Sequence, residues 1–188
     1  ILLQLESLFL VLTSLVSPIY KEKDWWVFLF CAIISFTIGA ISISIKKWED
    51  KINNHTHKYF SRADSFMVVA LTWVLFSIIG MIPFIEIAGM GITDAFFETM
   101  SGFTTTGSTV INDIDSLSYG LKFWRAISQW MGGLGIVVFT FALVPTGEMR
   151  NNNIFSAEAT GITLDKFSPK IGSTARRLLM IYAILTIV

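Results

Sequence analysis

A run of hydroxyl-bearing residues and glycine lies between two long apolar segments of this chain, and it constrains the fold more than any other feature. The stretch Thr93–Val110 begins with an amphipathic helical pattern and continues through Thr104–Thr109, where Gly107 is the one residue without a hydroxyl group. Irregular backbone at membrane depth is tolerated only where it is buried in protein or lines a water-filled path. This order of segments is typical of a re-entrant pore loop, in which backbone carbonyl groups replace the hydration shell of an ion.

Composition supports a location in the membrane. The chain is 53% hydrophobic and 15% charged, with a mean hydropathy of +0.65, which lies outside the range of soluble globular domains. The net charge is zero, so no overall positive field points to nucleic acid as a partner. Cys31 has no cysteine to pair with and is expected to pack as a small apolar residue. His55 and His57 share a polar loop without further ligands, so no metal site is expected there.

Four apolar segments are expected to cross the membrane: 2–20, 25–45, 66–83 and 121–145. The paired Trp25 and Trp26 suit the membrane–water boundary, and so does Phe123-Trp124. A further apolar run, Leu178–Val188, is too short to cross as given, and both ends of the sequence read as cuts through a longer protein. Glu6 is expected in the headgroup zone rather than as a functional acid inside the membrane.

The distribution of lysine and arginine predicts the orientation. These residues concentrate in 46–62 and in 150–177, whereas the stretch 63–120 has none. The positive-inside rule therefore places both basic segments in the cytoplasm. Both basic segments can lie in the cytoplasm only if the short helical segment before Thr104 enters the membrane from the outer side and returns to that side. The charge pattern thus favours a re-entrant loop independently of the loop's own composition.

The predicted pore helix has half the length that a crossing helix needs. Thr93 or Asp94 is expected as its N-cap, and the pattern continues to Phe103. Counted from Asp94, this helix is ~15 Å long, half of the ~30 Å hydrocarbon layer. Its unpaired terminal carbonyl groups and the negative end of its dipole would then point at Thr104–Thr109, where a cation is stabilised. Phe96, Phe97 and Phe103 are expected to pack around it.

The residues after the pore helix favour a hard cation. Gly107 can adopt backbone conformations that are closed to other residues, which lets successive carbonyl groups turn toward one axis. The run contains neither thiol nor imidazole, so soft metals are disfavoured. The outer loops carry acidic residues that would raise the local concentration of cations: Glu86, Asp94, Glu98, Asp113 and Asp115.

Two charges and a glycine-rich motif are expected to support this loop. Glu98 and Arg125 are the best-placed opposite charges, and we expect them to pair behind the loop and brace it. In the alternative, Glu98 faces solvent in the outer mouth and Arg125 reaches the headgroups. The motif Gly132-Gly133-x-Gly135 fits either a flexible or closely packed helix beside the pore, or ordinary small-residue packing between membrane helices.

These residues resemble the TrkH/TrkG/KtrB superfamily of potassium transporters, and the TrkH branch is the most similar because two extra helices precede the pore unit. The resemblance rests on three stretches: 94–107, 123–138 and 169–186. It implies an all-α integral membrane protein with a potassium-channel-like unit of helix, pore helix, filter and helix. By the same resemblance, the unit supplies one quarter of a filter ring through Thr104, Thr105, Thr106, Gly107 and Ser108. Potassium is expected at Thr105, Thr106 and Gly107, and no organic cofactor is expected.

The resemblance also organises the chain into domains. Residues 1–45 are two N-terminal membrane helices, 46–65 a cytoplasmic basic loop and 66–145 the first pore repeat. Residues 146–174 form a cytoplasmic connector, which is either a coupling element or an interfacial linker, and 175–188 begin a second repeat. The resemblance implies a multi-pass protein of the cell's inner (plasma) membrane. It also implies a homodimer and a cytoplasmic nucleotide-binding regulatory subunit.

Other functions fit the residues less well. An intramembrane enzyme would need a nucleophile–base pair or metal spacing, which the sequence does not provide, so we expect no enzyme. A non-conducting structural or receptor subunit and a less selective sodium/potassium transporter remain as alternatives. The sequence does not distinguish channel-like passage from coupling to sodium or protons.

Overall fold

The computed structural model describes residues 2–52, 62–143, 177 and 180–186, and every regular element among them is an α-helix. The chain divides into two compact units, residues 1–133 and 134–188. The first holds α1 to α5 and the beginning of α6; the second holds the end of α6 and a helical stretch at 180–186. The all-α architecture expected from the sequence is confirmed for the described residues.

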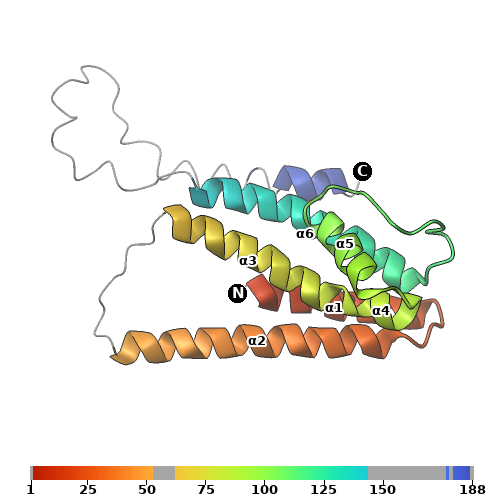
Figure 1. The fold of residues 1–188 in the computed structure, drawn as a ribbon, viewed down its shortest axis with the longest axis horizontal. Coiled ribbons are helices and arrows are strands. Elements are labelled where there is room, and N and C mark those ends of the chain that lie inside the picture. The colour runs from red at the N-terminus through yellow and green to blue at the C-terminus, as the bar shows by residue number, and fades with distance from the viewer. Residues whose placement is uncertain (1, 53–61, 144–176, 178–179, 187–188) are drawn as a thin grey trace, which may run out of the picture. The chain divides into compact units, whose positions relative to one another are not determined.

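Helices α1 (Leu2–Ile19) and α2 (Trp25–Ile52) form an antiparallel hairpin, drawn in red and orange in Figure 1. Pro18 lies in the last turn of α1, where the chain is about to leave the helix. The turn contains Lys21 at φ 62°. Helix α2 continues past its expected end at Ile45, because the polar residues that follow include neither glycine nor proline.

The third apolar segment is divided between two helices, α3 (Arg62–Gly80) and α4 (Ile82–Ala88). The sequence predicted one helix that ends at Pro83, and this boundary is wrong. Pro83 instead lies in the first turn of α4, where its missing N–H leaves no helical hydrogen bond unmade. Gly89, at φ 64°, ends α4, as is common for glycine after a helix.

Three described helical stretches are long and apolar enough to cross a membrane: Leu2–Ile19, Trp25–Ile45 and Ala70–Ala88. Helix α6 (Tyr119–Leu143) has 25 residues, or ~38 Å at ~1.5 Å per residue. It contains the start of the fourth predicted crossing, and the last two residues of that crossing lie outside the described part of the chain.

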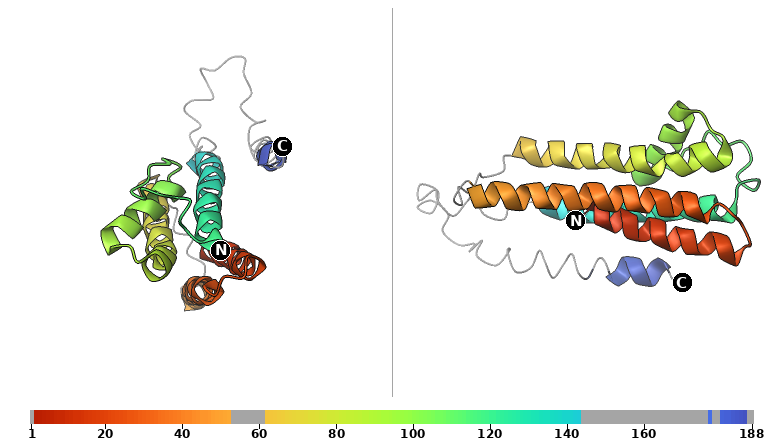
Figure 2. Two further views of the ribbon diagram at one scale, coloured as in Figure 1. Left: turned by 90° about the vertical axis from the view of Figure 1, so that its right-hand side faces the viewer. Right: turned by 90° about the horizontal axis from the view of Figure 1, so that it is seen from below.

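Helix α5 (Ile92–Phe103) is the short helix between α4 and α6. Within residues 1–133, Figures 1 and 2 show that the chain enters α5 from the end where the turn joins α1 to α2. The loop 104–118 returns to the same end before α6 begins. The backbone thus returns to the end from which it came, as the charge pattern predicts for a re-entrant loop.

Aromatic rings from three helices hold the end of α5. Phe103 is fully buried, and its ring centroid lies 5.4 Å from that of Phe76, 6.2 Å from Trp73 and 6.1 Å from Trp124. Contacts of this kind contribute ~0.5–1.5 kcal/mol each beyond the area they bury. Phe103 therefore packs as expected, whereas Phe97 is 45% exposed.

Glu6 is buried between α1 and α2. Its Oε2 lies 2.8 Å from the hydroxyl oxygen of Ser35, which also lies 2.8 Å from the carbonyl oxygen of Leu3. Ser35 is near the middle of the apolar stretch Trp25–Ile45, and Glu6 has no exposed surface. The expectation of a carboxylate in the headgroup zone is therefore wrong.

Several predictions fall on residues that the structure does not describe. The loop 53–61, with His55 and His57, and the connector 146–174 lie outside the described part of the chain, so what the sequence predicts for them stays a prediction. Of the basic loop 46–65, the described residues at both ends are helical extensions of α2 and α3.

Candidate ion-binding site

Helix α5, the candidate pore helix, begins earlier than the sequence predicts. Helix α5 starts at Ile92, with Gly91 as its N-cap and no side-chain cap hydrogen bond. The prediction of Thr93 or Asp94 as the N-cap is therefore wrong, and Asp94 lies inside the first turn, where a carboxylate interacts favourably with the helix dipole. The predicted end at Phe103 is correct.

The backbone amides of the loop fold back onto the end of this helix. Thr104 N–H donates to Met100 O at 2.9 Å and Thr105 N–H to Gly102 O at 2.9 Å. Ser101 O accepts from Thr106 N–H at 3.0 Å and from the amide of the next residue at 3.3 Å. The carbonyl groups of Met100, Ser101 and Gly102 are thus paired with the loop rather than unpaired as predicted, because the chain turns tightly enough to supply their donors, whereas that of Phe103 accepts no hydrogen bond from a described residue.

Within Thr104–Ser108, this pairing leaves three carbonyl groups available. The carbonyl oxygens of Thr105, Thr106 and Gly107 accept no hydrogen bond from the part of the chain that the structure describes. Thr104 O, by contrast, accepts from the Thr105 hydroxyl at 2.7 Å. Since the amides of Thr104–Gly107 point to the helix, these three successive carbonyl groups are free acceptors directly after it, as are those of 109–112 further along the loop. Oxygen atoms of this kind suit a hard cation.

Two residues of the loop have left-handed backbone conformations. Gly107 has φ 74° and Thr105 has φ 57°. The conformation of Gly107 agrees with the role that the sequence predicts for it from the conformational freedom of glycine. A β-branched residue in this region is unusual, and strained positions of this type cost ~1–3 kcal/mol and cluster at functional sites. No sequence pattern indicated the conformation of Thr105.

Ser108 differs from the other predicted site residues. Its carbonyl oxygen accepts a hydrogen bond of 2.6 Å from the hydroxyl group of Ser101 on α5. One of its lone pairs is thus directed to the pore helix, so Ser108 anchors the end of the loop as well as belonging to it. Sequence reasoning did not identify Ser101, because a serine in the last turn of a helix has no distinctive signal.

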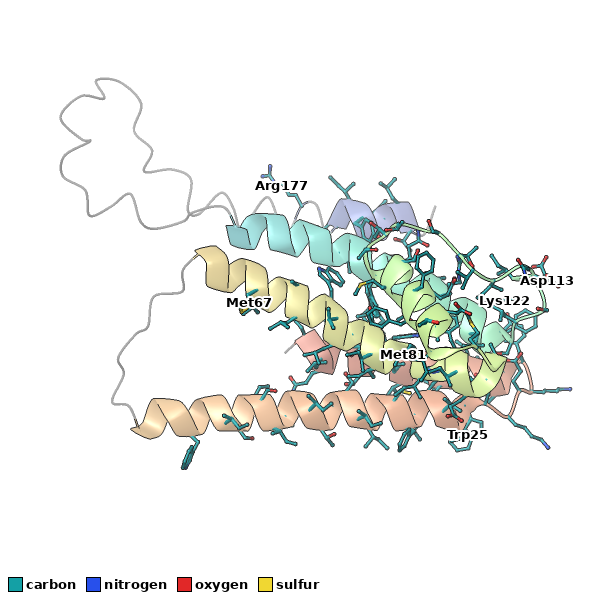
Figure 3. The ribbon with its side chains drawn as sticks, in the orientation of Figure 1. Trp25, Met67, Met81, Asp113, Lys122 and Arg177 are labelled. Atoms are coloured by element: carbon teal, nitrogen blue, oxygen red, sulfur yellow. The ribbon has the colours of Figure 1, made fainter. Side chains whose placement is uncertain are left out.

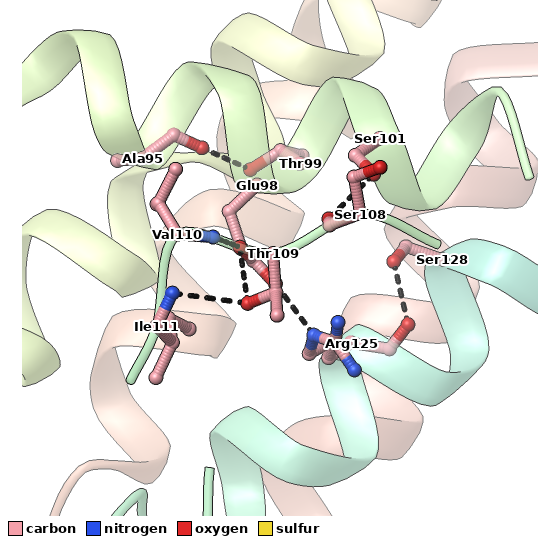
Figure 4. A network of polar contacts seen from close by, with 10 residues as sticks. All are labelled: Ala95, Glu98, Thr99, Ser101, Ser108, Thr109, Val110, Ile111, Arg125 and Ser128. Carbon is pink, nitrogen blue, oxygen red and sulfur yellow. Dashed lines mark hydrogen bonds and ion pairs between the residues drawn. The ribbon is translucent and has the colours of Figure 1, made fainter. Parts of the chain in front are cut away.

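Glu98 is the centre of a network behind the loop, shown in Figure 4. Its Oε1 accepts a hydrogen bond from Arg125 Nε at 2.5 Å. Its Oε2 accepts from Thr109 Oγ1 at 2.9 Å and from Val110 N–H at 3.1 Å. The side chains of Glu98 and Arg125 are 1% and 21% exposed. The predicted pair is present, and the alternative in which Glu98 faces solvent is wrong.

Glycines let α6 approach this site closely. A Cβ atom built on Gly132 would overlap the backbone carbonyl group of Phe103 and lie 3.0 Å from Thr105 Cγ2. A Cβ atom on Gly102 would lie 2.6 Å from Ser128 Oγ. Gly132 therefore agrees with the interpretation of the glycine-rich motif in which the helix packs closely beside the loop.

Trp124 is a structural residue of the interior. It is fully buried, and its Nε1–H donates to the carbonyl oxygen of Gly80 at 3.0 Å. That carbonyl group lies at the break between α3 and α4, where the helical hydrogen bonds are interrupted. The expected place of Trp124 at the membrane–water boundary is therefore wrong.

Acidic residues gather at the end of the first unit where the loop 104–118 lies. Glu86, Asp94, Asp113 and Asp115 are all exposed. Figure 3 shows Asp113, Lys122 and Trp25 at this end, whereas Met67 lies toward the other end of α3. Lys122 donates to the carbonyl oxygen of Asp115 at 2.7 Å. Exposed carboxylates near the loop raise the local concentration of cations.

Comparison with known proteins identifies the family. Residues 32–188 match the TrkH family model, which is described as a cation transport protein. This match covers more than half of the chain. The chain belongs to the TrkH family. The family resemblance predicted from the sequence is confirmed, the chain is a multi-pass membrane protein, and, as a member of a cation transport family, it is not an enzyme.

Relatives with curated names align along nearly the whole chain. It is 35% identical over 181 residues to the Trk system potassium uptake protein TrkH of Salmonella typhimurium, and this alignment covers 95% of this chain and 36% of that protein. It is 33% identical over 189 residues to the Trk system potassium uptake protein TrkG of Escherichia coli, covering 99% and 38%. The chain thus spans just over a third of the length of these TrkH-family relatives.

A solved structure of the TrkH family has the same fold. The crystal structure of the potassium transporter TrkH from Vibrio parahaemolyticus is similar with a TM-score of 0.64 and 31% sequence identity, over 99% of this chain and 36% of that one. This similarity confirms the all-α membrane fold.

Proposed function

We propose that this chain supplies one quarter of a potassium-selective filter in a transporter that takes up potassium across the inner (plasma) membrane. One observation carries the proposal: the amides of Thr104–Gly107 turn to the pore helix, while the carbonyl groups of Thr105, Thr106 and Gly107 accept no hydrogen bond from any described residue. Carbonyl oxygens in this arrangement can replace the hydration shell of a cation.

The exposure of the loop supports a shared filter. Thr104, Thr106, Gly107 and Ser108 are exposed, although the end of α5 behind them is buried. An ion stripped of water needs oxygen ligands from all sides, and one loop supplies them from one side. The exposed face of the loop is therefore where further filter segments of a longer chain would pack, in agreement with the length of the relatives.

The proposed domains follow the membrane path. Residues 1–45 cross as a hairpin, 46–65 are cytoplasmic, 66–145 form one pore repeat, 146–174 are a cytoplasmic connector and 175–188 begin a second repeat. A homodimer and a cytoplasmic nucleotide-binding regulatory subunit are also part of the proposal. They rest on the family resemblance alone.

Uptake measurements test the proposed function. A chain of full family length that contains these residues should restore growth of a potassium-uptake-deficient strain at limiting potassium. Reconstituted in vesicles, it should take up Rb⁺ in preference to Na⁺. Measuring uptake at different sodium concentrations and pH values shows whether potassium transport is coupled to sodium or to protons. No flux would favour the non-conducting subunit, and equal uptake of both ions would favour the less selective transporter.

Labelling tests the membrane path. Single cysteines replace Trp48, at the end of α2, and Asn112, in the loop after the filter, in a Cys31→Ser background. Both positions are exposed. An impermeant thiol reagent should label Trp48→Cys only from the cytoplasm and Asn112→Cys only from outside. Labelling of both from one side would contradict the re-entrant assignment.

A further inference from the structure

Glu22, in the turn between α1 and α2, binds the first turn of α6. Its Oε1 accepts a hydrogen bond from Tyr119 N–H at 2.8 Å, and its Oε2 accepts from Gly120 N–H at 3.1 Å. These residues are 97 and 98 positions away in sequence. One carboxylate therefore joins the N-terminal hairpin to the helix that follows the filter.

The carboxylate completes the hydrogen bonding at the start of α6. The first four N–H groups of an α-helix have no acceptor within the helix. Ser118 lies at the N-cap position: its carbonyl oxygen accepts the first helical bond, from Lys122 N–H at 3.0 Å, and its Oγ accepts from Leu121 N–H at 3.3 Å. Glu22 supplies acceptors for the N–H groups of Tyr119 and Gly120, which have none within the helix. A negative charge at this position also interacts favourably with the helix dipole.

Close packing surrounds this contact. The rings of Tyr20 and Tyr119 are stacked, with centroids 4.1 Å apart and an interplanar angle of 8°. A Cβ atom on Gly120 would lie 2.9 Å from Phe28 Cε2 and would overlap the hydroxyl group of Ser17. The hairpin therefore packs closely against the first turn of α6, and the carboxylate of Glu22 fixes the position of that turn on the hairpin.

Helix α6 connects this contact to the filter. Arg125 lies less than two turns after Tyr119 on the same helix and binds Glu98 at 2.5 Å. Glu98 in turn binds Thr109 and Val110. A displacement of the first turns of α6 would thus move Arg125, and with it the carboxylate that anchors the chain after the filter.

We infer that Glu22 is a positioning residue: by holding the first turn of α6, it sets the place of the Arg125–Glu98 pair and so the geometry of the filter segment. The N-terminal hairpin, which lies outside the pore repeat, would then contribute to ion selectivity. The inference rests on the proposed function where it concerns selectivity, and on the contacts alone where it concerns the position of the chain.

The test compares Glu22→Ala, Glu22→Gln and the control Lys23→Ala in the full-length protein. Lys23 is exposed on the same turn. Hydrogen–deuterium exchange reports on the amides of 119–121 and 109–111, and vesicle uptake gives the ratio of Rb⁺ to Na⁺. Glu22→Ala should accelerate exchange in both segments and lower the ratio several-fold. Glu22→Gln keeps one acceptor oxygen and should lie between Glu22→Ala and the wild type, and Lys23→Ala should match the wild type.

Each outcome decides the inference. Faster exchange at 119–121 alone, with wild-type exchange at 109–111, would mean that Glu22 caps the helix without positioning the filter, and this would overturn it. Unchanged exchange in both segments would overturn it too. If Glu22→Ala does not fold, Glu22→Gln supplies the comparison. A wild-type protein that carries no potassium would refute the proposed function, and exchange at 109–111 would then decide the positioning role by itself.

Discussion

Arg125 Nε lies 2.5 Å from Glu98 Oε1, although the two residues are 27 positions apart and belong to different helices. The same carboxylate accepts hydrogen bonds from Thr109 and Val110. One buried side chain therefore connects α5, α6 and the chain that follows Ser108. Its negative charge is compensated by one guanidinium group and by two hydrogen-bond donors.

Neutralising either partner should destabilise the protein. Removal of one member of a buried pair typically costs ~3–5 kcal/mol, and the partial exposure of Arg125 puts Glu98→Gln and Arg125→Gln near the lower value. The exchange Glu98→Arg with Arg125→Glu should recover part of the loss, because it restores the ion pair. Recovery stays incomplete, since an arginine cannot accept from Val110 N–H. The measurement is a double-mutant cycle on thermal unfolding in detergent; strictly additive losses would contradict the pair's coupling.

Gly107 should be required for selectivity because of its backbone conformation. A Cβ atom there would lie 3.6 Å from Gln129 Nε2, an ordinary contact, so the cost of Gly107→Ala comes from φ 74° and is ~1–2 kcal/mol. We expect the uptake ratio of Rb⁺ to Na⁺ to fall by about tenfold, equivalent to ~1.4 kcal/mol.

Gly89 supplies the matched control, since it has φ 64° and open space around its Cβ position. Gly89→Ala should lose a similar amount of stability and keep the wild-type ion preference. If both variants lose selectivity equally, the effect is one of general stability and Gly107 has no special place in the filter.

Gly132→Ala should displace the end of the pore helix. Its Cβ atom would overlap the backbone carbonyl group of Phe103, which cannot move without the residues that follow it. Overpacking of this kind costs ~1–3 kcal/mol, and we expect reduced thermal stability together with a changed ion preference. In the control Gly91→Ala, the new Cβ atom meets only Asp94 Oδ2 at 3.8 Å. That variant should lose no more than ~1 kcal/mol, through the poorer N-cap, and keep the wild-type ion preference; a tolerated Gly132→Ala would show that α6 does not constrain the loop.

The sequence was sufficient for the features that follow from local patterns. Apolar length predicted the crossing helices, the turn-permitting residue Gly107 predicted its left-handed backbone, and opposite charges in an apolar unit predicted the contact of Glu98 with Arg125. Each of these depends on residue type and spacing alone. The family resemblance, confirmed by the match of 32–188, rests on the same patterns.

The features that the sequence did not predict depend on three-dimensional proximity. Trp124 reads as a boundary residue, but it donates to Gly80 O because α3 breaks beside it. Glu22 reads as one charge in a polar turn, yet it caps a helix 97 positions away. Glu6 was misplaced because its burial depends on how α1 packs on α2. Hydrogen bonds between distant segments leave no periodic signal, so only the structure can supply them.

The contact between Glu6 and Ser35 leads to a prediction about their hydrogen bonding. Ser35 Oγ lies 2.8 Å from both Leu3 O and Glu6 Oε2, but a hydroxyl group has one proton to donate. The side-chain amide of Glu6→Gln can donate to Ser35 Oγ, which frees the hydroxyl proton for Leu3 O. Glu6→Gln should therefore remain within ~1 kcal/mol of the wild type in thermal unfolding. Glu6→Ala should lose ~2–4 kcal/mol through the cavity and the lost partner.

Substitutions on α2 separate this contact from the general effect of removing a hydroxyl group. Ser35→Ala leaves Glu6 buried without its partner and should cost ~1–3 kcal/mol. Thr37→Ala removes an exposed hydroxyl group that binds Ile34 O of its own helix, and it should stay within ~0.5 kcal/mol of the wild type. If Glu6→Gln is instead as damaging as Glu6→Ala, the site requires a group that only accepts, and Ser35 must give its proton to Glu6 rather than to Leu3.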